Sequence, residues 1–326
     1  MKFTIGRSLS RFKLGRSKLF AFVTSLIAFA VVIPLLPFSP SVANTAANPP
    51  TSVQFVPPSW VTEHASDANL RILDVRFSPF DYFVGHIPNA VHIADNTFRG
   101  PNGALPVQYW KTDKLRSLFT EAGVTDSSKV LIYSDGRDFL GATMVAYLLE
   151  RTGHDNVAIL DGGFAGYKAA QLPITKEFPQ YTPGTFNVSD NATIRVTLDQ
   201  LKGLIGKSGV TLIDPRPPEV FAGEQDIWVR NGHIPGAKNI PWVTFTLGET
   251  NFHQLKPLDE IRKILADRGI TPADDIIVTC STGREATLQY NVLKHVLGYE
   301  KVRVYEGSWT EYSSRPDLPI ATGRDV

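Results

Sequence analysis

The only cysteine among the 326 residues, Cys280, stands where its thiol could act as a nucleophile. It follows an apolar run at residues 276–278, which is typical of a buried parallel strand, and it precedes a helical pattern at residues 285–297. The connecting loop passes through Gly283, and the first free N–H groups of the helix would point at the thiol. This arrangement predicts an anion-binding loop that starts at Cys280.

Such N–H groups and the positive end of the helix dipole favour an anion, and Arg284 adds positive charge nearby. We therefore predict a lowered pKa for the Cys280 thiol and a thiolate near neutral pH. An ionised thiol among fixed hydrogen-bond donors can form a covalent intermediate. The alternative is a small buried core residue, as most free cysteines are. A position between strand and helix favours the reactive interpretation.

The composition narrows the classes of protein that the chain could belong to. Its length fits two domains of roughly 100–150 residues each. A hydrophobic content of 43%, a charged content of 20% and a net charge of +1 are ordinary, so no nucleic acid partner is expected. A single cysteine excludes an intramolecular disulfide, and no set of cysteines and histidines has the spacing of a structural zinc site. We expect a monomer without cofactor or metal.

Residues 1–43 have the pattern of a signal peptide. Six basic residues lie between positions 2 and 18, an apolar run covers residues 19–38, and small residues end at Ala43, after which we expect cleavage. The run is also long enough for an uncleaved anchor, so a membrane is a partner only if this segment is retained. Either alternative predicts an exported protein, in the periplasm or an equivalent extracytoplasmic space. Residues 44–58 are predicted to be a flexible spacer.

Most of the remaining chain repeats itself once, which indicates a duplicated domain rather than a short-period solenoid. The repeat aligns Ser134 with Cys280, so one copy has a hydroxyl where the other has the thiol. The matching blocks are residues 71–76 with 211–216, 85–90 with 232–237, 129–134 with 275–280, and 156–164 with 301–309.

Within each copy, short apolar strands alternate with helical segments. In the first copy we expect strands at residues 72–74, 130–133 and 157–160, and a helix at residues 140–151. This alternation predicts an α/β fold, a parallel sheet with helices on both faces. Ligands of such sheets bind at the carboxyl ends of strands, which is where Cys280 lies.

Four spaced motifs follow one another in the second copy. They are Asp214-Pro215-Arg216, then Gly232-His233-Ile234-Pro235-Gly236-Ala237, the strand-end Cys280, and Glu306-Gly307-Ser308-Trp309. Together these motifs resemble the tandem-domain rhodaneses, the thiosulfate/3-mercaptopyruvate sulfurtransferase family, over about residues 55 to 322. The resemblance implies two tandem rhodanese-like domains, an inactive one at residues 59–172 and a catalytic one at residues 196–322, joined by a linker at residues 173–195.

The resemblance implies that Cys280 takes sulfane sulfur from thiosulfate or 3-mercaptopyruvate and passes it, as a persulfide, to cyanide or a thiol acceptor. It assigns donor binding to Arg216, whose guanidinium suits a sulfonate or carboxylate. An ion pair of Arg216 with Asp214 or Glu219 is the alternative. The loop residues expected to hold the donor and the persulfide are Ser281, Thr282, Gly283 and Arg284.

The sequence does not decide whether the sulfur donor is thiosulfate or 3-mercaptopyruvate. Ser281 and Thr282 are similar to the corresponding residues in the mercaptopyruvate branch of the family. That branch has an apolar residue where this chain has Arg284. That branch also recruits an aspartate and a histidine from the first domain, and here Asp95 is present without the histidine. If Arg216 and Arg284 both face the loop, thiosulfate should be used at least as well as mercaptopyruvate.

The other recurring polar residues are predicted to be structural: His86 and His233 would brace turns, and Asp74 and Asp214 end strands. In the first copy, Asp135 and Asp138 beside Ser134 would repel an anionic donor. A cysteine-dependent phosphatase is disfavoured, because Ala286 stands where its arginine would be. The remaining alternative is a non-catalytic module outside the cytoplasm that senses or binds persulfides.

Overall fold

The computed structural model describes residues 53–135, 138–248 and 251–324. The predicted signal peptide or anchor at residues 1–43, and most of the predicted spacer, lie outside the described residues. In the described ranges, no helix is both long and apolar enough to cross a membrane.

The first domain contains a five-stranded sheet in which every pair of neighbours is parallel. Its strands are apolar because both faces are covered, and all four residues of the strand Val157–Leu160 are buried. In spatial order the strands are β1 (Val53–Val56), β7 (Val157–Leu160), β6 (Lys129–Tyr133), β2 (Leu70–Asp74) and β3 (Ala90–His92). The helices are α1 (Pro58–Glu63), α2 (Pro79–Val84), η1 (Asp95–Phe98), α3 (Thr112–Glu121), α4 (Leu140–Arg151) and α5 (Gly163–Ala169).

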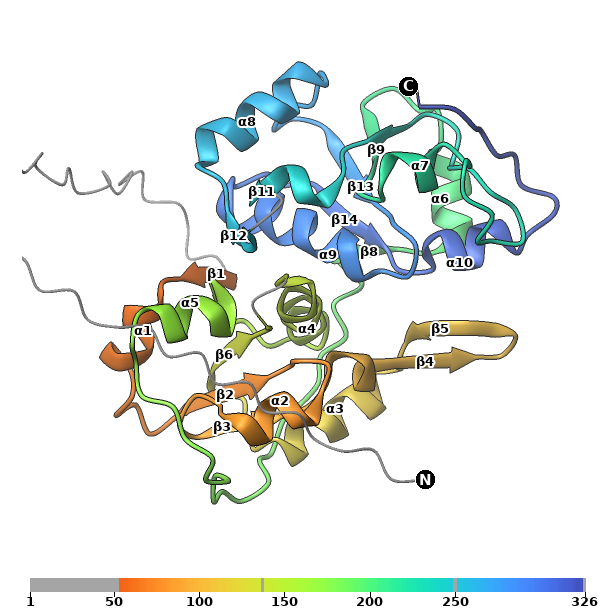
Figure 1. Ribbon diagram of the computed structural model, residues 1–326. Coiled ribbons are helices and arrows are strands. Elements are labelled where there is room, and N and C mark those ends of the chain that lie inside the picture. The colour runs from red at the N-terminus through yellow and green to blue at the C-terminus, as the bar shows by residue number, and fades with distance from the viewer. Residues whose placement is uncertain (1–52, 136–137, 249–250, 325–326) are drawn as a thin grey trace, which may run out of the picture. The chain divides into compact units, whose positions relative to one another are not determined.

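The second domain repeats this arrangement, with the same spatial order when its sheet is followed from β8 (Figure 1). Its parallel strands are β8 (Arg195–Val196), β14 (Val302–Tyr305), β13 (Asp275–Val278), β9 (Val210–Asp214) and β10 (Ala237–Asn239). The helices are η2 (Ala192–Ile194), α6 (Leu198–Leu204), α7 (Pro218–Phe221), η3 (Trp242–Phe245), α8 (Leu258–Asp267), α9 (Arg284–Asn291) and α10 (Ser308–Ser313). The predicted α/β fold with two parallel sheets is confirmed.

The predicted elements agree with the structure except in two places. The helix expected at residues 285–297 is α9 followed by a π-helical turn, Val292–Val296. The spacer expected at residues 44–58 is wrong at its end, because β1 and the start of α1 lie there. Val53 and Val56 are buried beside β7, so this stretch belongs to the sheet.

Most of the predicted linker at residues 173–195 packs against the first domain, whereas its last residues form η2 and the start of β8 in the second domain. Thr175 exchanges two backbone hydrogen bonds with His86, each of 2.9 Å. Phe186 is buried with its ring edge-on to Phe119. The segment between the two domains therefore contributes to the core of the first.

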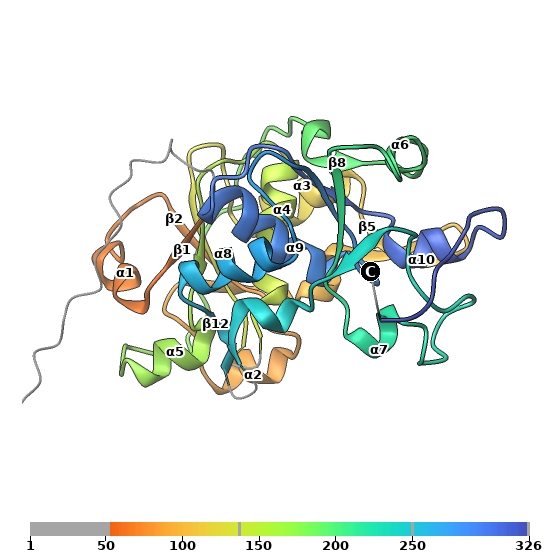
Figure 2. The same ribbon diagram turned by 90° about the horizontal axis from the view of Figure 1, so that it is seen from above.

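One hydrophobic core joins the two domains through α4 and α9, which pack against each other (Figures 1 and 2). Every residue of α4 is buried. Buried hydrogen bonds cross this contact: Asn291 Nδ2 donates to the carbonyl of Thr143 at 3.0 Å, and Tyr290 Oη donates to Glu150 at 2.9 Å. Separate hydrophobic clusters fill the outer faces of the two sheets.

Each domain also extends a two-stranded hairpin to the other domain. The first domain's hairpin, β4 (Arg99–Asn102) and β5 (Leu105–Tyr109), lies against α10 (Figure 1). The second domain's hairpin is β11 (Thr246–Gly248) and β12 (Asn251–Leu255), and its Leu255 N–H donates to Asp161 at 3.2 Å. The site around Cys280 is therefore lined by residues of both domains.

Candidate active site

Cys280 lies just after β13, at the start of the loop that leads into α9. Its side chain is almost completely buried, with 1% of the residue exposed. The Gly283 N–H donates to Sγ over 3.1 Å, which requires the left-handed backbone of Gly283, at φ 91°. The predicted loop of N–H groups directed at the thiol is therefore present.

The start of α10 holds the outer side of this loop. The Trp309 N–H donates to the carbonyl of Cys280 at 2.8 Å. Thr310 donates to the carbonyl of Ser281 twice, from its N–H at 3.1 Å and from its hydroxyl at 2.8 Å. The end of the Glu-Gly-Ser-Trp motif and the following Thr310 thus fix the backbone of Cys280 and Ser281.

The first domain's hairpin closes the inner side of the loop. Tyr109 Oη donates to the carbonyl of Gly283 at 2.8 Å, and a methyl group added to Gly283 would meet that oxygen at 2.5 Å. Arg99 Nη1 donates to the hydroxyl of Thr282 at 3.0 Å. Sequence reasoning missed Tyr109 and Arg99, because the hairpin that carries them lies outside the repeated motifs.

The predicted lowered pKa of Cys280 is wrong for this closed site. Burial raises the pKa of the thiol well above its ordinary value, and the carboxylate of Glu285 raises it further. The N–H groups of Ala286 and Thr282 act in the opposite direction and are outweighed. The loop amides were predicted correctly, but the carboxylate one residue beyond Arg284 was not assigned a role.

Arg216 lies fully buried in an ion pair with Asp214, the arrangement that was the alternative to donor binding. Its Nε contacts both carboxylate oxygens at 2.9 Å, and its Nη2 also donates to the carbonyl of Gly232. Arg76 and Asp74 form the same pair in the domain without a thiol, so this pair has a structural role in both copies. Arg216 Nη1 is buried without a hydrogen-bond partner among the described residues.

Arg284 points into the interface between the domains. Its Nε contacts Asp95 at 2.8 Å and its Nη2 contacts Asp138 at 3.3 Å, while 26% of its side chain is exposed. Two carboxylates of the first domain therefore balance the charge that was predicted to hold the donor. The contact with Arg284 also gives Asp138 a role other than the predicted repulsion of a donor from Ser134.

Ser134 occupies the place of the thiol in the first domain. Its hydroxyl accepts a hydrogen bond from the Ala142 N–H at 2.8 Å, at the start of α4. A cavity of about 420 Å³ beside it is lined by residues that include Asp95, Arg99, Ser134 and Arg284. The Ser134 hydroxyl thus lies at the start of a helix and accepts one of its N–H groups, as the Cys280 thiol does in the second copy.

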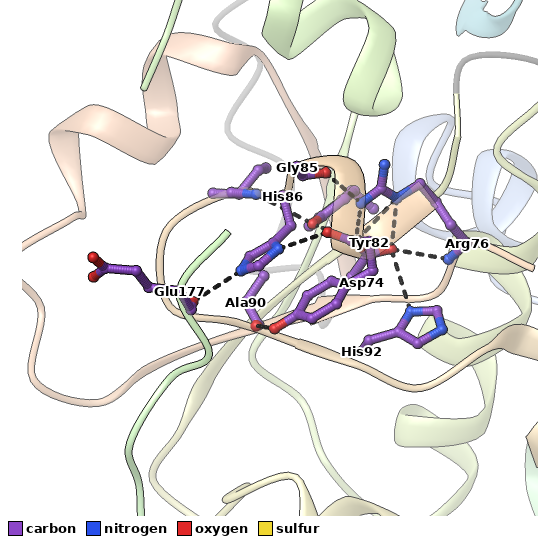
Figure 3. A network of polar contacts seen from close by, with 10 residues as sticks. Asp74, Arg76, Tyr82, Gly85, His86, Ala90, His92 and Glu177 are labelled. Carbon is purple, nitrogen blue, oxygen red and sulfur yellow. Dashed lines mark hydrogen bonds and ion pairs between the residues drawn. The ribbon is translucent and has the colours of Figure 1, made fainter. Parts of the chain in front are cut away.

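The two Gly-His-Ile-Pro histidines brace turns, as predicted. His86 stacks on Tyr82 with ring centroids 3.7 Å apart, and its Nδ1 lies 2.9 Å from the Tyr82 carbonyl. Figure 3 shows its other nitrogen directed at the carbonyl of Glu177 in the linker. His233 repeats the pattern by stacking on Phe221. Both histidines are buried, and the described contacts give them a structural role.

No group of three or more histidine, cysteine or acidic residues placed to hold a metal occurs within residues 53–135, 138–248 and 251–324. The hydrogen-bond donors directed at the Cys280 thiol are the backbone N–H groups of Gly283, Thr282 and Ala286. Such a set suits an anion.

Comparison with known proteins assigns the family. The model of the rhodanese-like domain matches residues 57–170 and again residues 197–315. The chain is 54% identical to a Synechococcus elongatus protein whose provisional name is thiosulfate sulfurtransferase, over 95% of this chain and 97% of that protein. It is 30% identical to the 3-mercaptopyruvate sulfurtransferase of Escherichia coli K12, over 82% of this chain and 97% of that protein.

Two further relatives extend the comparison. The sulfur carrier protein TtuD of Thermus thermophilus is 32% identical over 82% of this chain and 95% of that protein. The anaerobic ergothioneine biosynthesis enzyme of Chlorobium limicola shares the fold, with a TM-score of 0.72 at 23% identity, covering 83% of this chain and 70% of that chain. With both domains matched and a cysteine loop in the second, the chain belongs to the rhodanese family and is a tandem-domain sulfurtransferase.

Proposed function

We propose that this protein transfers sulfane sulfur from thiosulfate or 3-mercaptopyruvate to cyanide or a thiol through a persulfide on Cys280. The observation that carries the proposal is the thiol itself, held by the Gly283 N–H at the start of α9, while the other copy has Ser134 in its place. Relatives carry the names of both donors, which supports this donor class.

The chemistry divides into two steps. With thiosulfate, Sγ attacks the outer sulfur, a new S–S bond forms, and the donor's S–S bond breaks with its electron pair leaving on sulfite. With 3-mercaptopyruvate the C–S bond breaks, and the donor's thiol proton ends on the methyl group of pyruvate. An acceptor such as cyanide then attacks the terminal sulfur, so that thiocyanate leaves and the thiolate returns. Fixed N–H groups around Sγ stabilise the charge on the persulfide.

Donor binding relies on the loop rather than on two free arginines. Arg284 is neutralised by Asp95 and Asp138, and most of Arg216 is bonded to Asp214 and Gly232. Arg216 Nη1 is buried without a partner among the described residues, and Arg99 faces the loop at Thr282. This supports a sulfur donor whose single anionic group binds at Arg216 while its reacting sulfur lies at Cys280.

A mass spectrum of the purified protein after incubation with thiosulfate, and separately with 3-mercaptopyruvate, tests the persulfide. We expect one added sulfur on Cys280 and its loss on addition of cyanide, with release of thiocyanate. The matched control is Cys280→Ser, which should gain no sulfur and produce no thiocyanate while keeping its unfolding transition. Turnover by Cys280→Ser, or no added sulfur with either donor, would contradict the proposal.

A module that carries or senses a persulfide without turnover is the second candidate, because burial of Cys280 limits access to the thiol. Multiple turnovers separate the two candidates. An enzyme produces many equivalents of product per protein chain, whereas a carrier stops after one equivalent until a partner protein removes the sulfur.

We also propose that residues 1–43 direct export and that cleavage follows Ala43. The basic stretch and apolar run of the sequence support this. Cell fractionation with N-terminal sequencing of the mature chain tests it. A start near Asn44 in the extracytoplasmic fraction is expected, and an intact N-terminus in the cytoplasmic fraction would contradict the proposal.

A further inference from the structure

Arg99 brings to the Cys280 loop a positive charge that the proposed mechanism leaves unused. It is the first residue of β4, is half-buried, and donates from Nη1 to the hydroxyl of Thr282 at 3.0 Å. Its Nε and Nη2 have no hydrogen-bond partner among the described residues, and no described carboxylate forms an ion pair with it. One edge of the guanidinium group therefore remains able to bind a ligand.

The edge formed by Nε and Nη2 is the one with which this protein binds its own carboxylates. Arg76 holds Asp74 through these two nitrogens. Arg216 holds Asp214 in the same way. A guanidinium that donates two hydrogen bonds to one carboxylate binds it more strongly and in a more defined orientation than a single contact does. The unpartnered edge of Arg99 is therefore suited to a carboxylate.

Arg99 lines the cavity of about 420 Å³ together with Arg76 and Arg284. Arg76 and Arg284 each form ion pairs with described carboxylates. Among the described residues that line the cavity, Arg99 is thus the cation without a carboxylate partner. A cavity of this size is typical of sites for small organic molecules. It is larger than a compact inorganic ion such as thiosulfate requires.

The hairpins of the two domains differ at the position of Arg99. In the first hairpin, Arg99 pairs across the strands with Tyr109 at the end away from the turn. In the second hairpin, Thr246 pairs with Leu255 at the same place. The first hairpin contacts the loop of the thiol, whereas the second reaches the domain that has Ser134 in its place. The cation therefore accompanies the thiol, as expected of a residue that serves sulfur transfer.

The base of the first hairpin holds Arg99 in position. The indole of Trp110 lies so close to Gly100 that a methyl group added there would overlap it. Trp110 Nε1 donates to the carbonyl of Thr97 at 2.8 Å, which fixes the indole. Tyr109, opposite Arg99 in the ladder, is itself bonded to the thiol loop. A guanidinium held in this way loses little conformational freedom when it binds a ligand.

We propose that Arg99 is a specificity residue for the sulfur acceptor and binds the carboxylate of a small thiol that takes sulfur from Cys280. This inference rests on the proposed persulfide function. The donor's anionic group is assigned to Arg216 of the second domain, so a carboxylate at Arg99 belongs to the acceptor. Thr282, which Arg99 contacts, is two residues from Cys280, so their Cα atoms lie within about 7 Å of each other.

The transfer needs no further reagent. The acceptor's sulfur attacks the outer sulfur of the Cys280 persulfide and forms a new S–S bond, while the protein's own S–S bond breaks with its electron pair on Sγ. The acceptor leaves as a persulfide that carries the transferred sulfur and its hydrogen, and the acceptor's thiol proton passes to Sγ or to solvent. Arg99 keeps its charge throughout and orients the acceptor through the carboxylate.

Single-turnover assays with two matched acceptors test the proposal. Protein that carries the Cys280 persulfide after reaction with thiosulfate is mixed with 3-mercaptopropionate or with its neutral amide, and the loss of sulfur is followed by mass spectrometry. At equal thiolate concentration, wild type should react at least about tenfold faster with the carboxylate. Arg99→Gln should lose this preference, while its rates with the amide and its persulfide formation from thiosulfate stay within about twofold of wild type.

The matched control is Arg116→Gln, which removes a half-exposed arginine of α3 that pairs with Asp113. This variant should keep the preference for the carboxylate. A calorimetric measurement separates acceptor binding from sulfur transfer. Cys280→Ser should bind 3-mercaptopropionate at least about tenfold more tightly than the amide, and adding Arg99→Gln should abolish the difference.

Equal rates of wild type with the two acceptors would overturn the proposal, and this result needs no variant to fold. An Arg99→Gln protein that keeps the preference would also overturn it. So would equal slowing of both acceptors, which would make Arg99 a support of the loop, or a selective loss of the reaction with 3-mercaptopyruvate, which would make it a ligand of the donor. Absence of a persulfide with either donor would instead contradict the proposed function, and the calorimetric measurement would still report on Arg99.

Discussion

At the scale of single residues, opposing effects act on the pKa of the Cys280 thiol. The N–H groups of Gly283, Thr282 and Ala286 favour a thiolate, while burial and Glu285 favour a thiol. In wild type the second set prevails before a donor arrives. The loop is thus prepared for the negative charge that appears during sulfur transfer, rather than for a permanently charged resting state.

Arg284 lies next to the loop of Cys280, but its charge stabilises the contact between the domains through Asp95 and Asp138. We expect Arg284→Ala to lower the free energy of unfolding by about 1–3 kcal/mol, because it leaves the buried carboxylate of Asp95 without its ion-pair partner. The ratio of kcat/KM for thiosulfate to that for 3-mercaptopyruvate should stay unchanged. Denaturant unfolding and steady-state kinetics with both donors measure these effects. A selective loss for thiosulfate would instead restore Arg284 as the donor's ligand.

At the scale of elements, the hairpin β4 and β5 completes the active-site loop from the other domain. Tyr109 and Arg99 contact Gly283 and Thr282, and Gln108 Nε2 donates to the carbonyl of Gly307 at 3.2 Å. The second domain alone therefore lacks one wall of the site around Cys280.

Substituting Gly283 tests this wall. Gly283→Ala should reduce kcat/KM by tenfold or more, because the left-handed backbone is strained by a side chain and the methyl group would displace Tyr109. The matched control is Gly236→Ala, at φ 80° with no atom within 4 Å of the added methyl group. The control shares the backbone strain, about 1 kcal/mol, and should keep its activity. Equal activity losses in the two variants would contradict a specific role for the hairpin contact.

At the scale of the whole molecule, the two domains form one folding unit through α4, α9 and the exchanged hairpins. Asp161 belongs to the contact of β12 with the first domain, where its Oδ1 accepts from the Leu255 N–H. Burial raises the pKa of this carboxyl group from its ordinary value to about 6. Its charged form is therefore less stable in the folded protein than in the unfolded chain.

This gives a pH dependence with a definite sign. The folded state binds more protons than the unfolded state between about pH 4 and 6, so the free energy of unfolding falls as the pH rises through that range. Asp161→Asn should remove the buried charge and raise the free energy of unfolding at pH 8 by on the order of 1–3 kcal/mol. Urea unfolding of both proteins at pH 4 and pH 8 measures this change. The raised pKa of Asp161 would be contradicted by a wild type whose free energy of unfolding does not fall between these pH values, or by an Asp161→Asn protein less stable than wild type at pH 8.

The sequence by itself determined the duplicated α/β fold, the position of Cys280 between a strand and a helix, and the structural role of the two histidines. Each depends on local information: apolar runs that must be buried, a glycine that turns a strand into a helix, and a repeated spacing of motifs. The strand before Cys280 and the helix after it follow from residues close in the chain.

Only the tertiary structure decided which charges meet. Arg284 and Asp95 are 189 positions apart and Tyr109 and Gly283 are 174 apart, so no local pattern links them. The pKa of Cys280 likewise depends on burial by both domains as well as on its own helix. Electrostatics at this site follow from long-range packing, which is why the loop was predictable and the protonation state of its thiol was not.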